Sequence, residues 1–227
     1  MRISEIYTSI QGECEKAGKP TVFVRTGGCN LRCALWPCDT PYAVDPKLYR
    51  HEWQQVQPNE LIDDVLKIAK GNVRNICFTG GEPFLQPNDE LKYVAEQLRF
   101  HYGFSVEFFS NGTLLYPEFV QNPSFTINMD WKLPGSGEDP NNLNRIENYK
   151  KMHDLLHVKF TIADRKDYET ARDLMYAFNM TRNVYMGVVW GKLTDKELIE
   201  WVMEEELPVS FTMQIHNHIW DRTQRGI

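Results

Sequence analysis

The sequence lacks long apolar runs and long basic runs. No uninterrupted apolar stretch approaches the roughly 20 residues of a membrane-spanning helix, and the first residues, MRISEIYTSIQGE, contain no apolar signal core. The formal net charge is −6, from 25 Lys and Arg against 31 Asp and Glu. We therefore expect a cytoplasmic protein with no membrane segment. Nucleic acid is not expected as a direct substrate, because a phosphate backbone binds clustered positive charge.

Cysteine is also scarce, with five in 227 residues. An odd number argues against a disulfide framework, and Cys29, Cys33 and Cys38 lie close together in the run GGCNLRCALWPCDT. Three thiolates can hold three irons of a [4Fe-4S] cluster, which normally has four thiolate ligands. The fourth iron would then be open to a small molecule. We expect Cys14, in a loop, and Cys77, in the apolar run NICFTG, to bind no metal.

A structural zinc site is the alternative for the three cysteines. Such a site needs four nitrogen or sulfur ligands in a closed tetrahedron, and no local histidine or fourth cysteine completes it. A zinc-stabilised binding module therefore stays open as a function of a different class. An absorption band near 400 nm would separate the two metals.

Alternation of short β-rich runs with helix-period segments predicts a single α/β domain over residues 1–227 with parallel strands. The fold class is a doubly wound sheet or a full or partial TIM-like barrel. Seven strands are predicted: Thr21 to Thr26, Asn75 to Thr79, Ser105 to Ser110, Phe125 to Asp130, His157 to Ile162, Asn183 to Val189 and Val209 to Ile215. Helical stripes include Leu61 to Ala69, Leu91 to Leu98 and Ala171 to Phe178, and Thr194 with Glu197 predicts a capping box.

The polar residues that follow these strands should face one mouth, because parallel strands present their ligands at their carboxyl ends. Arg25 and Gly28 follow the first predicted strand, and Thr79 to Glu82 the second. Ser110 to Gly112 and Asp130 to Lys132 follow the third and fourth. The loop-rich stretch Leu133 to Leu143 is interpreted as a flap over that mouth.

The cysteine run resembles the cluster loop of the radical S-adenosylmethionine superfamily. That superfamily has the spacing C-x3-C-x2-C, whereas this chain has C-x3-C-x4-C, so Cys38 requires its own test as third ligand. The segment Thr79-Gly80-Gly81-Glu82-Pro83 resembles the superfamily's GGEP element, whose backbone meets the amino end of S-adenosylmethionine. The side chain of Glu82 has the alternative of capping the following turn. A glycyl-radical activating enzyme, which shares the cysteines and GGEP, is a competing function.

A narrower resemblance covers almost the whole chain. The N-terminal EIYTSIQGE, the run TVFVR, the CDT after the cluster, LPGSG after Lys132, and the C-terminal residues around His216, Trp220 and Arg225 resemble the 7-carboxy-7-deazaguanine synthase family. The resemblance implies a lyase that converts 6-carboxytetrahydropterin to 7-carboxy-7-deazaguanine by radical ring contraction with loss of ammonia, on the pathway to queuosine. It also implies an incomplete α/β barrel, usually a homodimer, with S-adenosylmethionine used catalytically and Mg²⁺ as a further cofactor.

The same resemblance assigns roles to matching positions. Thr40 would bind Mg²⁺, together with the substrate carboxylate. The cofactor S-adenosylmethionine would be bound by Gly81, Glu82, Ser110, Asp130, Trp131, Lys132, Gly187 and Val188. The pterin would be bound by Ile10, Gln11, Gly12, Glu13, Arg25, Thr79, His216 and the terminal carboxylate of Ile227. An electron donor such as flavodoxin or ferredoxin is implied. For His216, plain packing is an equal alternative.

Overall fold

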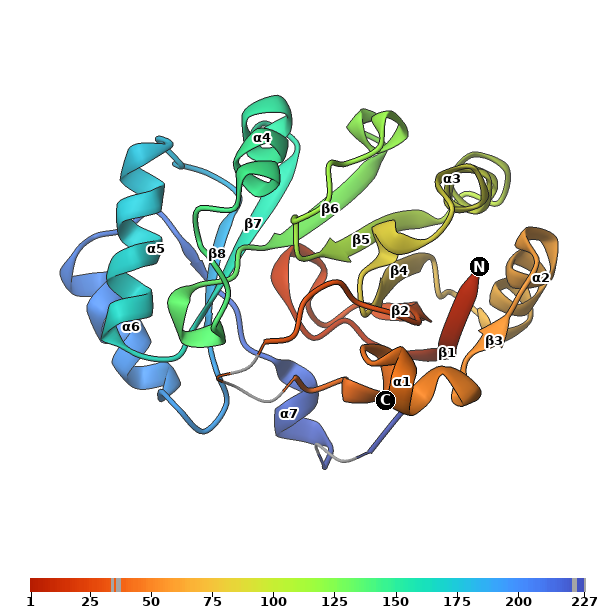
Figure 1. Ribbon diagram of the computed structural model, residues 1–227, viewed down its shortest axis with the longest axis horizontal. Helices are drawn as coiled ribbons and strands as arrows, with labels where there is room; N and C mark the ends of the chain where they lie inside the picture. The colour runs from red at the N-terminus through yellow and green to blue at the C-terminus, as the bar shows by residue number, and fades with distance from the viewer. Residues whose placement is uncertain (34, 36–37, 222–223, 227) are drawn as a thin grey trace.

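The computed structural model describes residues 1–33, 35, 38–221 and 224–226. These residues form one sheet of nine strands in the order β3-β1-β2-β4-β5-β6-β7-β8-β9 (Figure 1). The pairs from β2 to β9 are parallel, whereas β1 is antiparallel to both β2 and β3. The sheet curves without closing, so the predicted incomplete α/β barrel is confirmed.

The strand bounds are close to the predicted ones where the strands are parallel. They are β1 Arg2–Ile10, β2 Pro20–Thr26, β3 Gln54–Gln55, β4 Asn75–Gly80, β5 Ser105–Ser110, β6 Phe125–Asp130, β7 Leu156–Ile162, β8 Val184–Val188 and β9 Ser210–Phe211. The last predicted strand is shorter than expected, since a helix begins at Ile215. Strand β1 was not among the seven predicted strands.

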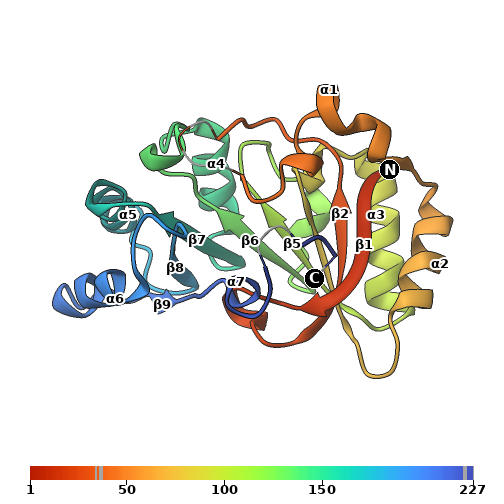
Figure 2. The ribbon, with the colours of Figure 1, turned by 90° about the horizontal axis from the view of Figure 1, so that it is seen from below.

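The helices from α2 to α6 lie on the outer side of the curved sheet, and α7 lies between its two ends (Figures 1 and 2). The helices are α1 Pro46–Tyr49, α2 Pro58–Ile68, α3 Asn88–Glu96, α4 Leu143–Met152, α5 Arg165–Ala177, α6 Asp195–Glu204 and α7 Ile215–Ile219; those on the outer side are α2 to α6. The predicted capping box of Thr194 and Glu197 opens α6. Among the described residues, no helix is long and apolar enough to cross a membrane.

The two faces of the sheet carry different side chains, as the two-residue period of a strand requires. In β2, Val22 and Val24 are fully buried in the main core under the outer helices. The alternate residues Phe23 and Arg25 point to the inner face, where they line a cavity. The sequence of one strand therefore supplies both core and site.

Segments far apart in sequence join the two ends of the open barrel. The Cys14 N–H donates to the Thr212 hydroxyl at 2.9 Å, and the Ile215 N–H donates to the Gly12 carbonyl at 3.1 Å. Cys14 has a φ of 58°, the left-handed region that usually favours glycine, which agrees with its interpretation as a loop residue. The N-terminal loop and the segment before α7 thus close the gap that the sheet leaves.

Candidate active site

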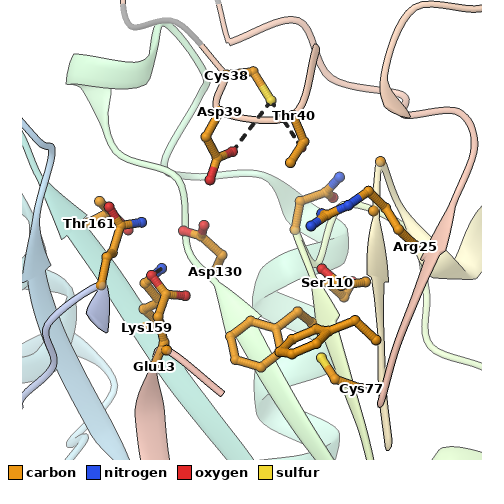
Figure 3. Close-up of a pocket in the computed structure, with 18 of the residues that line it drawn as sticks. Glu13, Arg25, Cys38, Asp39, Thr40, Cys77, Ser110, Asp130, Lys159 and Thr161 are labelled. Carbon is orange, nitrogen blue, oxygen red and sulfur yellow. Dashed lines mark hydrogen bonds and ion pairs between the residues drawn. The ribbon is translucent and has the colours of Figure 1, made fainter. Parts of the chain in front are cut away.

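A cavity of about 290 Å³ opens at the carboxyl ends of the parallel strands (Figure 3). The four predicted strand ends all contribute to its lining: Arg25, Thr79 to Gly81, Ser110 with Asn111, and Asp130 with Lys132. The N-terminal run Ile10 to Glu13 and His216 complete the wall. The prediction that these sequence-distant groups face one mouth is confirmed.

All three cysteines of the loop line this cavity. Burial raises the pKa of each thiol, that of Cys29 to about 11. Without metal the thiols are therefore protonated at neutral pH, and binding of iron has to displace their protons. Cys38 lies 3.6 Å from the Thr40 hydroxyl and 3.9 Å from the Asp39 carboxylate, so the CDT run enters the cavity as one unit (Figure 3).

The three thiols line one cavity together. An iron-sulfur cube distributes its thiolates over separate irons, whereas structural zinc draws four ligands to one point. Within the part of the chain that the structure describes, no group of three or more His, Cys, Asp or Glu side chains is arranged to hold a single metal ion. The shared cavity of Cys29, Cys33 and Cys38 is compatible with thiolates on separate irons of one cube.

The paired glycines bring β4 against the loop that follows β2. Gly80 has a φ of +123°, and a Cβ on Gly81 would overlap the Gly28 carbonyl and lie 2.6 Å from the Ala43 carbonyl oxygen. Only glycine allows this approach. The backbone of the GGEP element is thus placed against Gly28, the residue before Cys29. Its contact with S-adenosylmethionine stays a prediction.

The Glu82 side chain caps the turn, as the alternative for this residue anticipated. Its carboxylate accepts hydrogen bonds from the Phe84 N–H, the Ser110 hydroxyl and the Asn111 N–H at 3.1, 2.9 and 2.8 Å. Burial raises the pKa of Glu82 to about 7 in spite of these three donors. Its carboxylate therefore fixes the ends of β4 and β5 relative to each other, and contact with S-adenosylmethionine stays a prediction.

The three residues of the DWK run have different surroundings. Asp130 and Lys132 form an ion pair of 2.7 Å in the cavity wall. Burial would raise the pKa of Asp130, but the positive charges of Lys132 and Lys159 hold it below its ordinary value. The Trp131 indole is fully buried against Tyr149 and its N–H donates to the Pro140 carbonyl at 2.8 Å. The described side chains that reach the cavity from this run are therefore those of Asp130 and Lys132.

Arg25 is held in place on the inner face of β2. Its Nε donates to Glu5 at 2.6 Å and its terminal nitrogen donates to the Tyr7 hydroxyl, also at 2.6 Å. The Tyr7 ring stacks on Phe23 with centroids 5.1 Å apart. A guanidinium that is held by an ion pair next to a flat aromatic surface suits a planar ligand with hydrogen-bond acceptors.

His216 packs directly on the predicted pterin-binding loop. A Cβ on Gly12 would overlap the imidazole, and burial lowers the pKa of His216, so the ring is neutral at pH 7. His218, two residues further on, is exposed and contacts the Trp190 ring. Of the two imidazoles, the one singled out in the sequence lies in the cavity.

Four predicted ligands of S-adenosylmethionine are not part of the cavity lining: Glu82, Trp131, Gly187 and Val188. Gly187 packs on the backbone of Thr212, and the lining near the end of β8 comes from Val189 and Trp190. The predicted ligand Ile227 lies outside the described residues. The roles of these positions stay predictions.

Lys159 and Thr161, two polar residues of β7 that were not predicted from the sequence, also line the cavity (Figure 3). Burial would lower the pKa of Lys159, but Glu13, whose carboxylate is 2.7 Å away, and Asp130 raise it above its ordinary value. The buried Thr161 hydroxyl has no hydrogen-bond partner among the described residues. A lysine inside the apolar run LHVKFTI was the available signal, because an unpaired charge is costly in a core strand.

The comparisons with known proteins agree with this geometry. The family model of the Radical SAM superfamily matches residues 23–122, which include the cysteine loop and the Gly-Gly turn. The crystal structure of QueE from Escherichia coli superimposes with a TM-score of 0.71, covering 93% of each chain at 19% identity. The fold and the site therefore define a radical S-adenosylmethionine protein.

Full-length relatives give the family. The chain is 33% identical to the 7-carboxy-7-deazaguanine synthase of Leptospira interrogans, over 99% of this chain and 97% of that one. It is 31% identical to the enzyme of the same name from Clostridium acetobutylicum, over 100% and 99% of the two chains. The chain belongs to the 7-carboxy-7-deazaguanine synthase family. Membership in this family favours a 7-carboxy-7-deazaguanine synthase over the two alternatives, a glycyl-radical activating enzyme and a zinc-stabilised binding module.

Proposed function

We propose that this protein converts 6-carboxytetrahydropterin to 7-carboxy-7-deazaguanine by radical ring contraction with loss of ammonia. The observation that carries the proposal is that three thiols of one loop and the ends of four parallel strands enclose the same cavity. The relatives that carry this activity in their name match the chain from end to end.

Cys29, Cys33 and Cys38 would hold a [4Fe-4S] cluster, and the Gly81 backbone beside them would bind S-adenosylmethionine. A cluster held by these thiolates would supply the single electron for reductive cleavage of S-adenosylmethionine, with methionine as the other product. The Asp130–Lys132 pair places one negative and one positive group in the same wall. Such a pair suits the amino and carboxylate groups of a methionine moiety.

The substrate side of the cavity would bind the pterin. Gln11 and Arg25 offer donors to its polar edge and carboxylate, and the Tyr7–Phe23 stack offers an apolar surface next to them. His216 closes the wall behind Gly12 and excludes water from the reacting face. Holding C6 of the pterin in a dry, fixed position is the contribution that these residues make to the radical step.

Mg²⁺ would bind at the CDT run. The Thr40 hydroxyl and the Asp39 carboxylate both line the cavity, and such hard oxygen donors suit this ion, which keeps several waters and takes further ligands from its substrate. The expected test is turnover with and without Mg²⁺ in Thr40→Ala. This variant should bind S-adenosylmethionine normally but need more Mg²⁺ for the same rate.

The central test is anaerobic reconstitution with iron and sulfide. We expect about four irons per chain and a broad absorption near 400 nm. After reduction, S-adenosylmethionine and 6-carboxytetrahydropterin should yield 7-carboxy-7-deazaguanine and ammonia, measured by chromatography with mass detection. Colourless protein, or a loaded cluster without this product, would overturn the proposal.

Cys38→Ala tests the third ligand, because the spacing before Cys38 departs from the superfamily's. We expect loss of turnover and of bound iron. Cys14→Ala is the matched control, since burial and a backbone bond to Thr212 place Cys14 outside the cluster loop. A Cys38→Ala protein with full iron and full turnover would remove this residue from the ligand set.

We also propose that the enzyme is a homodimer and takes its electron from a flavodoxin or a ferredoxin. Sedimentation of the anaerobic protein tests the first point, and turnover with each purified donor in place of dithionite tests the second.

A further inference from the structure

A closed ring of hydrogen bonds lies next to Cys29. The Asn30 side-chain amide donates to the Thr113 hydroxyl at 2.7 Å, and this hydroxyl donates to the Asn111 carbonyl oxygen Oδ1 at 2.5 Å. The Asn111 amide then donates to Asn30 Oδ1 at 3.1 Å, which returns to the start. The three residues come from the cluster loop and from the loop after β5.

The ring fixes which way the Asn111 amide points. Its Oδ1 accepts a second hydrogen bond, from the Thr113 N–H at 2.9 Å, so the carbonyl end is held on the Thr113 side. One hydrogen of the Nδ2 group is used by Asn30. The other is directed at the Cys29 sulfur, 3.8 Å from Nδ2. Both hydrogens of the Asn111 amide and the hydroxyl hydrogen of Thr113 then have an acceptor.

The Asn111 backbone is fixed as firmly as its side chain. Its N–H donates to Glu82 at 2.8 Å, and its carbonyl accepts from Arg145 Nε at 3.1 Å. Asn111 is 7% exposed, and Arg145 is fully buried. The donor to the sulfur is therefore placed before any cofactor binds.

We propose that Asn111 is a positioning residue for the cluster, whose amide donates a hydrogen bond to the Cys29 thiolate while Thr113 and Asn30 hold that amide in orientation. The inference rests on the proposed function, since it needs a cluster on Cys29. Hydrogen bonds to cluster sulfurs stabilise the more negative, reduced state and so raise the reduction potential. In the absence of metal, the Leu31 N–H is a further donor to the same sulfur, at 3.4 Å.

The test is the midpoint potential of the reconstituted cluster, measured by redox titration with electron paramagnetic resonance. Asn111→Leu keeps a side chain of similar size, which limits entry of water, but has no donor. We expect its potential to be lower than that of the wild type. Thr113→Val removes the hydroxyl that orients the amide and keeps the amide itself, so its potential should shift in the same direction by less.

Asn144→Ala is the matched control. The Asn144 amide donates to the Thr113 carbonyl at 2.9 Å, so this variant disturbs the same loop without a direct change at the sulfur or in the ring. Its potential and iron content should equal those of the wild type. A shift in Asn144→Ala as large as in Asn111→Leu would show that general loosening of the loop is the cause, and would overturn the proposal.

Three further outcomes can be told apart. If Asn111→Leu loses its iron, the potential is read from Thr113→Val, and a wild-type value there overturns the inference. If the wild-type protein itself binds no cluster, the proposed function fails. If it binds one and turns over, but both ring variants keep the wild-type potential, only the role of Asn111 is wrong.

Discussion

Glu82 belongs to the GGEP element, and its side chain holds two loops of the site together. Its carboxylate joins the turn after β4 to the loop after β5, with three donors at 2.8–3.1 Å. The sequence is compatible with both cofactor binding and capping by this residue, and the structure shows capping. The same loop carries Asn111, so Glu82 also supports the donor to Cys29.

The raised pKa of Glu82 predicts a pH dependence of stability. Between its ordinary value of 4.5 and about 7, the folded protein keeps a proton that the unfolded chain has released. The free energy of unfolding should therefore fall as pH rises through this window and level off above it, by up to about 3 kcal/mol. Urea unfolding of wild type and Glu82→Gln at pH 5 to 8 measures the difference.

In Glu82→Gln this part of the pH dependence should be missing. Glu118→Gln, which changes an exposed glutamate, should keep the wild-type profile. Parallel profiles for wild type and Glu82→Gln would contradict the assignment of the titration to Glu82.

At the scale of elements, the parallel strands were predictable from short β-rich runs, and the amphipathic helices from apolar residues at helical spacing. Strand β5 and strand β6 have the predicted bounds. Helix α4 was missed because its buried face includes Arg145 and Asn148, so polar residues interrupt the apolar stripe. Strand β1 was missed since its apolar and polar residues alternate only weakly.

Side-chain networks were beyond sequence analysis for a different reason. The strand-end rule brought Asn111 to the correct mouth, but the ring with Asn30 joins residues 81 apart in sequence. Its hydrogen bonds depend on orientations that no periodicity encodes. The pair of Lys159 and Glu13, 146 residues apart, could not be predicted from the sequence for the same reason.

The loop from Pro134 to Gly137 is held by a carboxylate of α5, and removal of this carboxylate should lower the stability of the protein measurably. The carboxylate of Asp167, at the start of α5, accepts the N–H of Gly135 at 2.7 Å and that of Ala163 at 3.0 Å. Asp167→Ala removes the acceptor of both N–H groups. The Asp167 residue that is lost is only 1% exposed. We expect a loss of about 2–4 kcal/mol in the free energy of unfolding, because a hydrogen bond to a charged group contributes about 1.5–3 kcal/mol and both of these bonds are only partly buried.

Affinity for S-adenosylmethionine should also fall in Asp167→Ala, since Lys132 immediately precedes this loop. Asp173→Ala, at an exposed position of the same helix, is the control and should stay within about 0.5 kcal/mol of wild type. Wild-type stability and cofactor affinity in Asp167→Ala would show that the anchor is dispensable and that the loop behaves as the free flap anticipated from its composition.

For the whole molecule, the open sheet raises the question of what holds its two ends together. The ends are joined by the Cys14–Thr212 and Ile215–Gly12 hydrogen bonds and, inside the cavity, by the Lys159–Glu13 pair. Every one of these contacts involves the N-terminal loop between β1 and β2. The loop that is expected to bind the pterin thus also holds the two ends of the open barrel together. We therefore expect pterin binding and closure of the barrel to depend on the same residues.

We therefore expect that loss of the buried Lys159–Glu13 pair lowers the free energy of unfolding strongly. Lys159→Met leaves the Glu13 carboxylate buried without its 2.7 Å partner, and breaking such a pair costs about 3–5 kcal/mol. Glu13→Gln should cost less, and the double variant should be more stable than the sum of the two losses implies, because the unpaired charge is gone. Urea unfolding of all four proteins gives the coupling energy. Additive losses, with no coupling beyond about 0.5 kcal/mol, would show that the pair does not hold the barrel closed.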